Sequence, residues 1–553
     1  MKIFYRIWFG IHVITQLFAQ SLDPIPFDWS GQNGMSSYGG LLVWNRDWNS
    51  NELFFDGTFQ SYPLRFGEEI SRDATLSYTY TFCDISFPDS AKVRTSFDYR
   101  QGDYLYDQLN LHADFSRPKR IMKWNGFKRS YGGPFSQFIQ PQTGNKSTRA
   151  LTPNQQSYSF YYLSKMNNRI SALSIGRFIT DSGLYNNSEI NGLHQDEITT
   201  ATFFSKSNWN QFNLKFIISQ YLENRKWLSE FSTVSRHYLN RGQILGILST
   251  DDNENSSWEL GISGNTQALA FPDTTISKNR SWISVWGNLN RSRFQINGGL
   301  DAGNGSVLPR FSISMNRSLG SMRWINEVGM KNIPQHLMIW KSSQSFFESW
   351  INVNSKAKWN NGNLTVFGIF NYWHVNNLIK DGMESTISLK EMFSIETGYG
   401  WEAIHGLKIS GSWRHSNLEP IISDGISDQI KCDFEFTKSL FSDNMRLSAD
   451  LIIVGLLNRD TSFGFDPGLG RPFEHDWDSY ILPDYWTAHL DINARVSSVV
   501  ITYRIRNLFH TQKNTIKYIY PDLPEEWIWP RNNAHSLPMG QLVSFGVEWE
   551  FEE

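Results

Sequence analysis

Residues 543–551 have the sequence Val-Ser-Phe-Gly-Val-Glu-Trp-Glu-Phe, in which large apolar side chains alternate with polar or small ones. Successive side chains of a β-strand point to opposite faces, so this segment has one apolar face and one polar face. The alternation recurs along the chain from about residue 75, and clear copies lie at 294–301, 407–414, 486–497 and 499–506. The sequence therefore predicts a protein built of two-faced β-strands.

The length of these strands indicates a membrane-spanning protein. Several reach about ten residues, which is the length that a tilted transmembrane strand needs, whereas strands of water-soluble proteins are usually half as long. The polar faces carry many charges, as expected of strands that line a wet lumen and turn their apolar faces to lipid. Open sheet edges cannot persist in hydrocarbon, so we expect an all-β, antiparallel transmembrane barrel. The alternative is a large secreted all-β protein.

The lengths of the connections support this fold. From the C-terminus backwards, long links at 508–540, 458–484, 417–427, 375–385 and 332–345 alternate with short ones at 497–498, 441–444, 401–405, 360–362 and 318–320. Transmembrane barrels have short periplasmic turns and longer extracellular loops. Before residue 280 the alternation fails by one strand, near 226–266. Because single-chain bacterial barrels have even strand numbers, we predict about 22 strands, within a range of 20 to 24.

The N-terminus resembles an export signal. Lys2 and Arg6 precede a short apolar stretch, and Ala19 provides a small residue at a cleavage site, so residues 1–19 are predicted to be a signal peptide. Residues 20–74 are then a periplasmic or luminal segment, and residues 75–553 form the barrel. The expected location is the outer membrane.

Composition excludes several other classes. The 51 Lys and Arg residues nearly balance 54 Asp and Glu residues, giving a net charge of −3, so no cation excess is available to bind nucleic acid. No run of 18 apolar residues follows residue 19, which excludes a bundle of transmembrane helices. The abundance of aromatic residues, with 39 Phe, 22 Tyr and 22 Trp, excludes disorder. The only cysteines, Cys83 and Cys432, are predicted on opposite strand faces and therefore unpaired.

Aromatic residues gather near the predicted strand ends. Amphipathic rings favour the membrane–water interface, where they form girdles around a barrel. We assign the following residues to such girdles: Trp324, Trp359, Tyr372, Trp373, Tyr399, Trp401, Tyr485 and Trp486.

The C-terminal residues resemble the close of TonB-dependent-receptor-like barrels. The resemblance rests on Leu482 to Trp486, on the Arg506-Asn507-Leu508-Phe509 element, and on a last strand that opens at Gly540 and nearly ends at Phe551. It covers about 70 residues and implies an uptake barrel of this size. Such receptors carry a plug of well over a hundred residues, for which residues 20–74 are too short. This shortfall argues against an energy-coupling partner.

No catalytic motif is present, and neither a metal nor a cofactor is expected, so the chain is not predicted to be an enzyme. Two long C-terminal loops are candidates for ligand binding, because Trp faces beside charged groups bind sugars and other amphipathic solutes. Their candidate residues are Arg471, Asp476, Trp477, Trp527, Trp529 and Arg531. The alternative is that these loops fold over the barrel mouth and seal it.

The predicted lumen carries charges of both signs. The residues assigned to its lining are Lys408, Arg414, Asp433, Glu435, Asp491, Arg495, Arg504 and Arg506. A mixed lining predicts a channel or receptor-like protein that passes small solutes with weak charge selectivity. The alternatives are a membrane-anchored binding or assembly protein that uses its loops, and a barrel enzyme. The expected partners are outer-membrane lipid, the barrel-assembly machinery and a small solute.

Overall fold

The structure is a computed structural model. It describes residues 87–130, 154–186, 189–209, 211–229, 232–250, 256–272, 276–334, 347–379, 387–419, 422–459, 463–466, 471–474, 483–519, 521–522 and 540–552, with short pieces between residues 23 and 82. The predicted signal peptide and Cys83 lie outside the described residues. No helix within these ranges is long and apolar enough to span a membrane.

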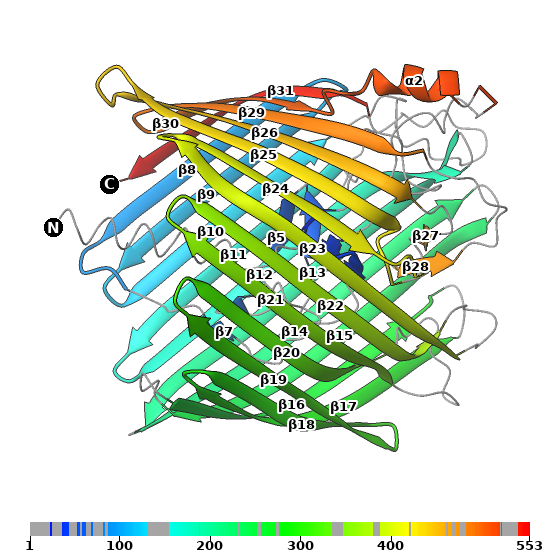
Figure 1. The fold of residues 1–553 in the computed structure, drawn as a ribbon. Coiled ribbons are helices and arrows are strands. Elements are labelled where there is room, and N and C mark those ends of the chain that lie inside the picture. The colour runs from blue at the N-terminus through cyan, green and yellow to red at the C-terminus, as the bar shows by residue number, and fades with distance from the viewer. Residues whose placement is uncertain are drawn as a thin grey trace, which may run out of the picture.

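A single closed barrel of 22 antiparallel strands forms the molecule (Figure 1), as predicted. Its strands are β8 (Lys92–Gly102), β9 (Asp107–Arg117), β10 (Arg120–Ser130), β11 (Asn154–Met166), β12 (Arg169–Asn186), β13 (Glu189–Trp209), β14 (Phe212–Ser229), β15 (Ser232–Thr250), β16 (Ser256–Ala270), β17 (Ser277–Arg291), β18 (Phe294–Gly303), β19 (Ser306–Leu319), β20 (Met322–Pro334), β21 (Phe347–Asn361), β22 (Leu364–Ile379), β23 (Ile387–Ile404), β24 (Leu407–Ser416), β25 (Ile426–Leu440), β26 (Met445–Arg459), β29 (Tyr485–Val496), β30 (Val499–Arg506) and β31 (Leu542–Glu552). The last strand, β31, closes the barrel by pairing with the first, β8.

The remaining described elements are small. Near the N-terminus, β1 (Asp23–Pro24), β2 (Ser36–Tyr38) and β3 (Leu41–Val43) form one sheet, while β4 (Glu52–Phe55) pairs with β5 (Thr58–Ser61) and β6 (Glu68–Glu69) with β7 (Thr81–Phe82). Within two long connections lie the hairpin of β27 (Phe463–Asp466) and β28 (Arg471–Glu474), and the helix α2 (Gln512–Ile519). The first barrel strand in the described residues is thus β8, whereas most of the segment just after residue 75 lies outside them.

The two ends of the barrel differ in their connections. One end has tight turns between consecutive strands, at 118–119, 167–168, 210–211, 292–293, 320–321, 362–363, 405–406 and 497–498. The C-terminus lies at this end, and α2, β27 and β28 lie at the opposite end (Figure 1). The opposite end carries the long connections, but two residues alone join β12 to β13, β14 to β15 and β18 to β19 there, so the expected alternation of short and long connections is not complete. The region 226–266, where strand counting from the sequence failed, holds the end of β14, all of β15 and most of β16.

The two faces of the wall follow the sequence alternation. Ile262, Ile283 and Phe545 point outward and are more than half exposed, as expected for a surface that contacts lipid. The intervening side chains point inward and are mostly polar; Asn354, for example, contacts Asn371 across the β21–β22 pair. Cys432 pairs in register with Gly411 and is a free cysteine.

The predicted girdles are partly wrong. Trp324, Tyr399 and Trp401 are exposed, but Trp373 and Tyr485 are completely buried. Trp373 lies opposite Asn352 and Met392, both of which belong to the inward row of their strands. Position near a strand end does not determine the face; the residue's place in the two-residue alternation does.

Candidate functional site

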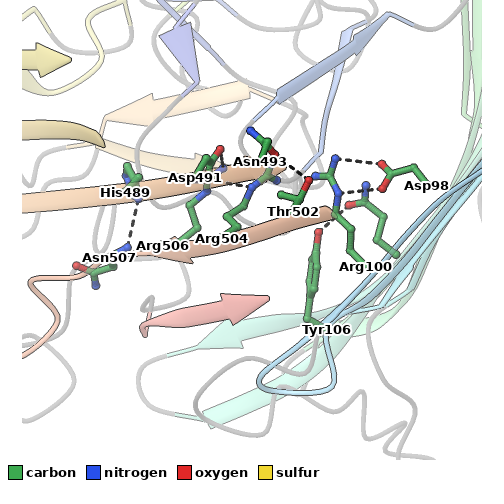
Figure 2. A network of polar contacts seen from close by, with 11 residues as sticks. Asp98, Arg100, Tyr106, His489, Asp491, Asn493, Thr502, Arg504, Arg506 and Asn507 are labelled. Atoms are coloured by element: carbon green, nitrogen blue, oxygen red, sulfur yellow. Dashed lines mark hydrogen bonds and ion pairs between the residues drawn. The ribbon is translucent and has the colours of Figure 1, made fainter. Parts of the chain in front are cut away.

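Charged side chains meet inside the barrel on β29 and β30, close to where the wall closes. Asp491 on β29 accepts hydrogen bonds from both terminal nitrogens of Arg506, at 2.6 and 3.1 Å. The Arg504 Nε lies 3.2 Å from the same carboxylate (Figure 2). One carboxylate thus holds two guanidinium groups, because residues two apart on β30 point to the same face. These side chains are neither fully buried nor fully exposed.

The polar row continues across the closure onto β8. Thr502 donates a hydrogen bond to Asn493 at 2.8 Å, and Arg100 pairs with Asp98 at 3.0 Å (Figure 2). Asp98 also accepts a hydrogen bond from Asn110 on β9. These contacts lie on both sides of the closure, and the Arg94–Glu550 ion pair between β8 and β31 crosses it.

The other predicted lining residues lie on neighbouring strands. Lys408 on β24 forms an ion pair with Glu435 on β25 at 2.8 Å, and both side chains are about half exposed. Asp433 lies two residues from Glu435, and Asp450 and Asp491 follow in register on β26 and β29. These carboxylates thus lie between Lys408 on one side and Arg504 and Arg506 on the other. Arg495, nearer the tight-turn end, lies opposite Arg446.

Arg414, the remaining lining residue, has a different environment. Its guanidinium forms an ion pair with Asp424 at 2.7 Å, and both side chains are nearly inaccessible to solvent. Asp424 lies in the connection between β24 and β25 at the long-loop end. The ion pair therefore fixes this connection against the inner wall.

The β2–β3 hairpin packs against the same place. Leu41 forms an isolated β-bridge with Ser423, and the backbone nitrogen of Asp424 donates to the Gly40 oxygen at 2.8 Å. Gly40 has a φ of +86°, and a Cβ atom there would lie 2.9 Å from both the Met392 Cε and the Ser416 Oγ. Met392 and Ser416 belong to the inward rows of β23 and β24, so the hairpin tip lies against the luminal wall.

Local sequence signals mark the hairpin but not its docking against the wall. Gly39-Gly40 between Tyr38 and Leu41 is a recognisable turn signal for a hairpin. Nothing local in the sequence, however, links residue 40 to Met392 or Ser423.

The Arg506-to-Phe509 element ends β30. Asn507 adopts a left-handed φ of +59°, and its backbone nitrogen donates to the His489 Nδ1 at 3.2 Å (Figure 2). The Leu508 nitrogen donates to the Ala488 oxygen, so the turn is fastened to β29. In the loop beyond, burial and then the charge of Lys513 lower the pKa of His510. The Arg506-to-Phe509 element therefore has a structural role: it ends β30 and holds the following turn against β29, next to the charged row.

Of the predicted loop residues, Arg471 is the first residue of β28 and lies opposite Asp466. Asp476, Trp477, Trp527, Trp529 and Arg531 lie outside the described residues, so the predicted loop site stays a prediction. In the described ranges no group of His, Cys, Asp and Glu side chains is placed to hold a metal ion.

Neither a protein-family model nor a curated protein sequence matches this chain. Solved structures do match its fold. The FrpB iron transporter from Neisseria meningitidis (F3-3 variant) aligns with a TM-score of 0.65 at 9% identity, covering 96% of this chain and 97% of that one. The ferric yersiniabactin uptake receptor FyuA from Yersinia pestis aligns at 0.62 with 12% identity, covering 96% and 94%.

The siderophore receptor PirA from Pseudomonas aeruginosa aligns with a TM-score of 0.58 at 9% identity, covering 85% of this chain and 82% of that one. The chain therefore has the fold of these receptor and transporter barrels. This confirms, at the level of the fold, the resemblance seen in its C-terminal residues.

Proposed function

We propose that this chain is an outer-membrane barrel through which a small solute passes, and that it acts by transport rather than catalysis. The apolar outer face fits lipid, and the polar inner face fits water and solutes. Support also comes from the similar solved structures, which are an iron transporter, a ferric yersiniabactin uptake receptor and a siderophore receptor.

The docked β2–β3 hairpin is the observation that carries the proposal. A barrel of 22 strands is wider than the porins that already leave an aqueous channel, so an unfilled lumen of this size conducts freely. Here a piece of the N-terminal segment lies against the inner wall at Met392, Ser416 and Ser423. We infer that this segment narrows the passage, in place of a larger plug.

The charges on the lumen wall support weak selectivity. Asp491, Arg504 and Arg506 offer both signs within one cluster, and the Lys408–Glu435 pair does the same nearer the tight turns. No ring of one sign is present among the described residues of these strands to set a strong electrostatic barrier.

A planar-bilayer recording tests the proposal. The chain without residues 1–19 is compared with a variant that also lacks residues 36–43, after both are shown to be folded by their heat-dependent gel mobility. We expect ion conductance with weak charge selectivity, and a higher conductance in the variant. Silence in both forms would refute transport and favour a barrel that anchors binding loops. Equal conductance would leave transport standing and refute the role of the hairpin.

A further inference from the structure

Two cations face each other on the outer surface of the barrel. Lys226 on β14 and Arg236 on β15 are direct partners in the antiparallel register. Both belong to the outward rows of their strands, which also carry the exposed Leu222 and Ile244. Directly opposed like charges destabilise a sheet unless an anion lies between or beside them.

No counter-ion from the described protein compensates this pair. Neither side chain makes an ion pair with any residue that the structure describes, and the Arg236 Nε is buried without a hydrogen-bond partner. Among the described residues of the outward row on β13, Glu197 is a carboxylate that lies opposite Asn224. Glu197 is already bound to Arg177 at 2.8 Å. Within the part of the chain that the structure describes, the two positive charges therefore have no compensating carboxylate.

The height of the pair along the barrel matches a lipid headgroup. The outward row of β14 carries exposed apolar residues from Phe212, beside a tight turn, to Leu222. A tilted strand rises about 2.5 Å per residue along the barrel axis, so this row spans about 25 Å, the height of the apolar band of such barrels. Lys226 lies four residues beyond Leu222, on the side of the long loops.

An aromatic residue marks the interface at the same place. Tyr238 on β15 is exposed and lies opposite Asn224, midway between Leu222 and Lys226 along β14. Amphipathic rings occupy the headgroup level of a membrane. The backbone positions of Lys226 and Arg236 thus lie about 5 Å beyond the level of Tyr238, and their long side chains can reach back to the lipid headgroups.

We propose that Lys226 and Arg236 together bind the phosphate group of an outer-leaflet lipid. A phosphate between two cations forms charge-assisted hydrogen bonds to both and removes their mutual repulsion. The site holds a boundary lipid at the face formed by β14 and β15. This inference rests on the outer-membrane location in the proposed function, but it does not depend on solute passage.

The chain provides a matched control pair. Arg117 on β9 and Arg120 on β10 are also directly opposed, and they belong to outward rows as well. They flank a tight turn at the other end of the barrel, facing the other leaflet, and both are exposed. Replacing either pair by Gln removes the same charge from the same cross-strand arrangement.

The experiment measures bound lipid directly. Wild type, the double variant K226Q/R236Q and the control R117Q/R120Q are extracted from the outer membrane in mild detergent, and native mass spectrometry counts the retained phosphorylated glycolipid. Each delipidated protein is then titrated with bisphosphorylated lipid A, with its dephosphorylated form, and with lipid A in the presence of inorganic phosphate. Heat-dependent gel mobility confirms that each barrel is folded.

We expect K226Q/R236Q to lose the retained glycolipid and to bind lipid A about twentyfold more weakly, since each cation near a membrane surface contributes about a fivefold effect. The control should bind like the wild type, and dephosphorylated lipid A should bind weakly to all three. Equal retention by wild type and K226Q/R236Q would overturn the proposal, as would an equal loss in the control. Displacement of lipid A by millimolar inorganic phosphate would show a free-phosphate site and also overturn it. The lipid-binding results do not depend on the planar-bilayer test of transport. If that recording shows no conductance, transport fails while the lipid site can still be confirmed or refuted.

Discussion

Two parts of the inner wall use the same alternating pattern for different purposes. On β23 and β24, the inward residues Met392, Arg414 and Ser416 are almost completely buried, and the β2–β3 hairpin lies against Met392 and Ser416. On β29 and β30, the inward residues Asp491, Arg504 and Arg506 keep part of their surface exposed. The inner face of β23 and β24 is a packing surface, whereas that of β29 and β30 is accessible to solvent.

Inward direction alone therefore does not make a residue part of a passage. Arg414 and Lys408 lie on the same face of β24, six residues apart, yet the first is buried in an ion pair and the second is half exposed. The energy of a charge depends on how far it is removed from water, so substitutions on the two walls should have effects of different size.

The largest effect is expected for Arg414→Gln. This change leaves the carboxylate of Asp424 buried without its cation, which costs about 3–5 kcal/mol. We expect a lower midpoint in guanidinium unfolding and faster hydrogen–deuterium exchange at residues 36–43, because the Asp424 backbone also holds Gly40. Unchanged exchange at the hairpin would show that the ion pair does not support the docking.

The substitution Gly40→Ala should release the hairpin with a smaller effect. Its positive φ costs an alanine about 1 kcal/mol, and the new Cβ would collide with Met392 and Ser416, adding about 1–3 kcal/mol. Gly305→Ala is the matched control, because its φ is +81° and nothing lies within 4 Å of a Cβ there. Hydrogen–deuterium exchange at residues 36–43 should rise only in Gly40→Ala. A similar rise in Gly305→Ala would show that the collision with Met392 and Ser416 is not the cause.

On the inner face of β29 and β30, Arg506→Gln should change selectivity more than stability. It removes two hydrogen bonds to Asp491 and leaves the carboxylate half-compensated by Arg504. We expect a reversal potential shifted toward cations by a few millivolts in a salt gradient, with about 1–2 kcal/mol lost in unfolding. Asp491→Asn should shift the potential in the opposite sense, and shifts of the same sign would contradict a role in the passage.

The smallest effect is expected for Lys408→Gln. The Lys408–Glu435 pair is about half exposed, and ion pairs of this kind contribute about 0–1 kcal/mol. The midpoint of unfolding should stay within error of the wild type. A loss comparable to that of Arg414→Gln, which shares its strand and face, would show that exposure does not distinguish the two walls.

Much of the barrel could be predicted from the sequence because its signals are local. Val543 and Phe545 alternate with small residues, and the short connection at Ser497 and Ser498 places a turn, whatever the rest of the chain does. The strand number of 22 followed from adding such signals and requiring an even total. The girdle assignments of Trp373 and Tyr485 failed because strand-end position was used instead of the inward or outward parity of each residue.

The sequence predicted which charged residues face the lumen, but not which of them contact one another. The sequence assigned Asp491, Arg504 and Arg506 to the lumen, and the structure places them in one cluster on adjacent strands. It could not show that Arg414 is withdrawn from the lumen by Asp424, because that contact depends on the path of the β24–β25 connection.

Which side chains share a face can be read from the sequence, since the two-residue period is a property of the backbone of each strand. What lies against each face depends on how the folded chain brings distant residues together. The closure of β31 on β8, the docking of Gly40 against Met392 and the pairing of Lys226 with Arg236 all join residues whose neighbourhood is set by register and by the path of the chain. Contacts of this kind form when the whole barrel closes, because their free energy depends on many distant residues at once. No periodic pattern in the sequence therefore indicates them.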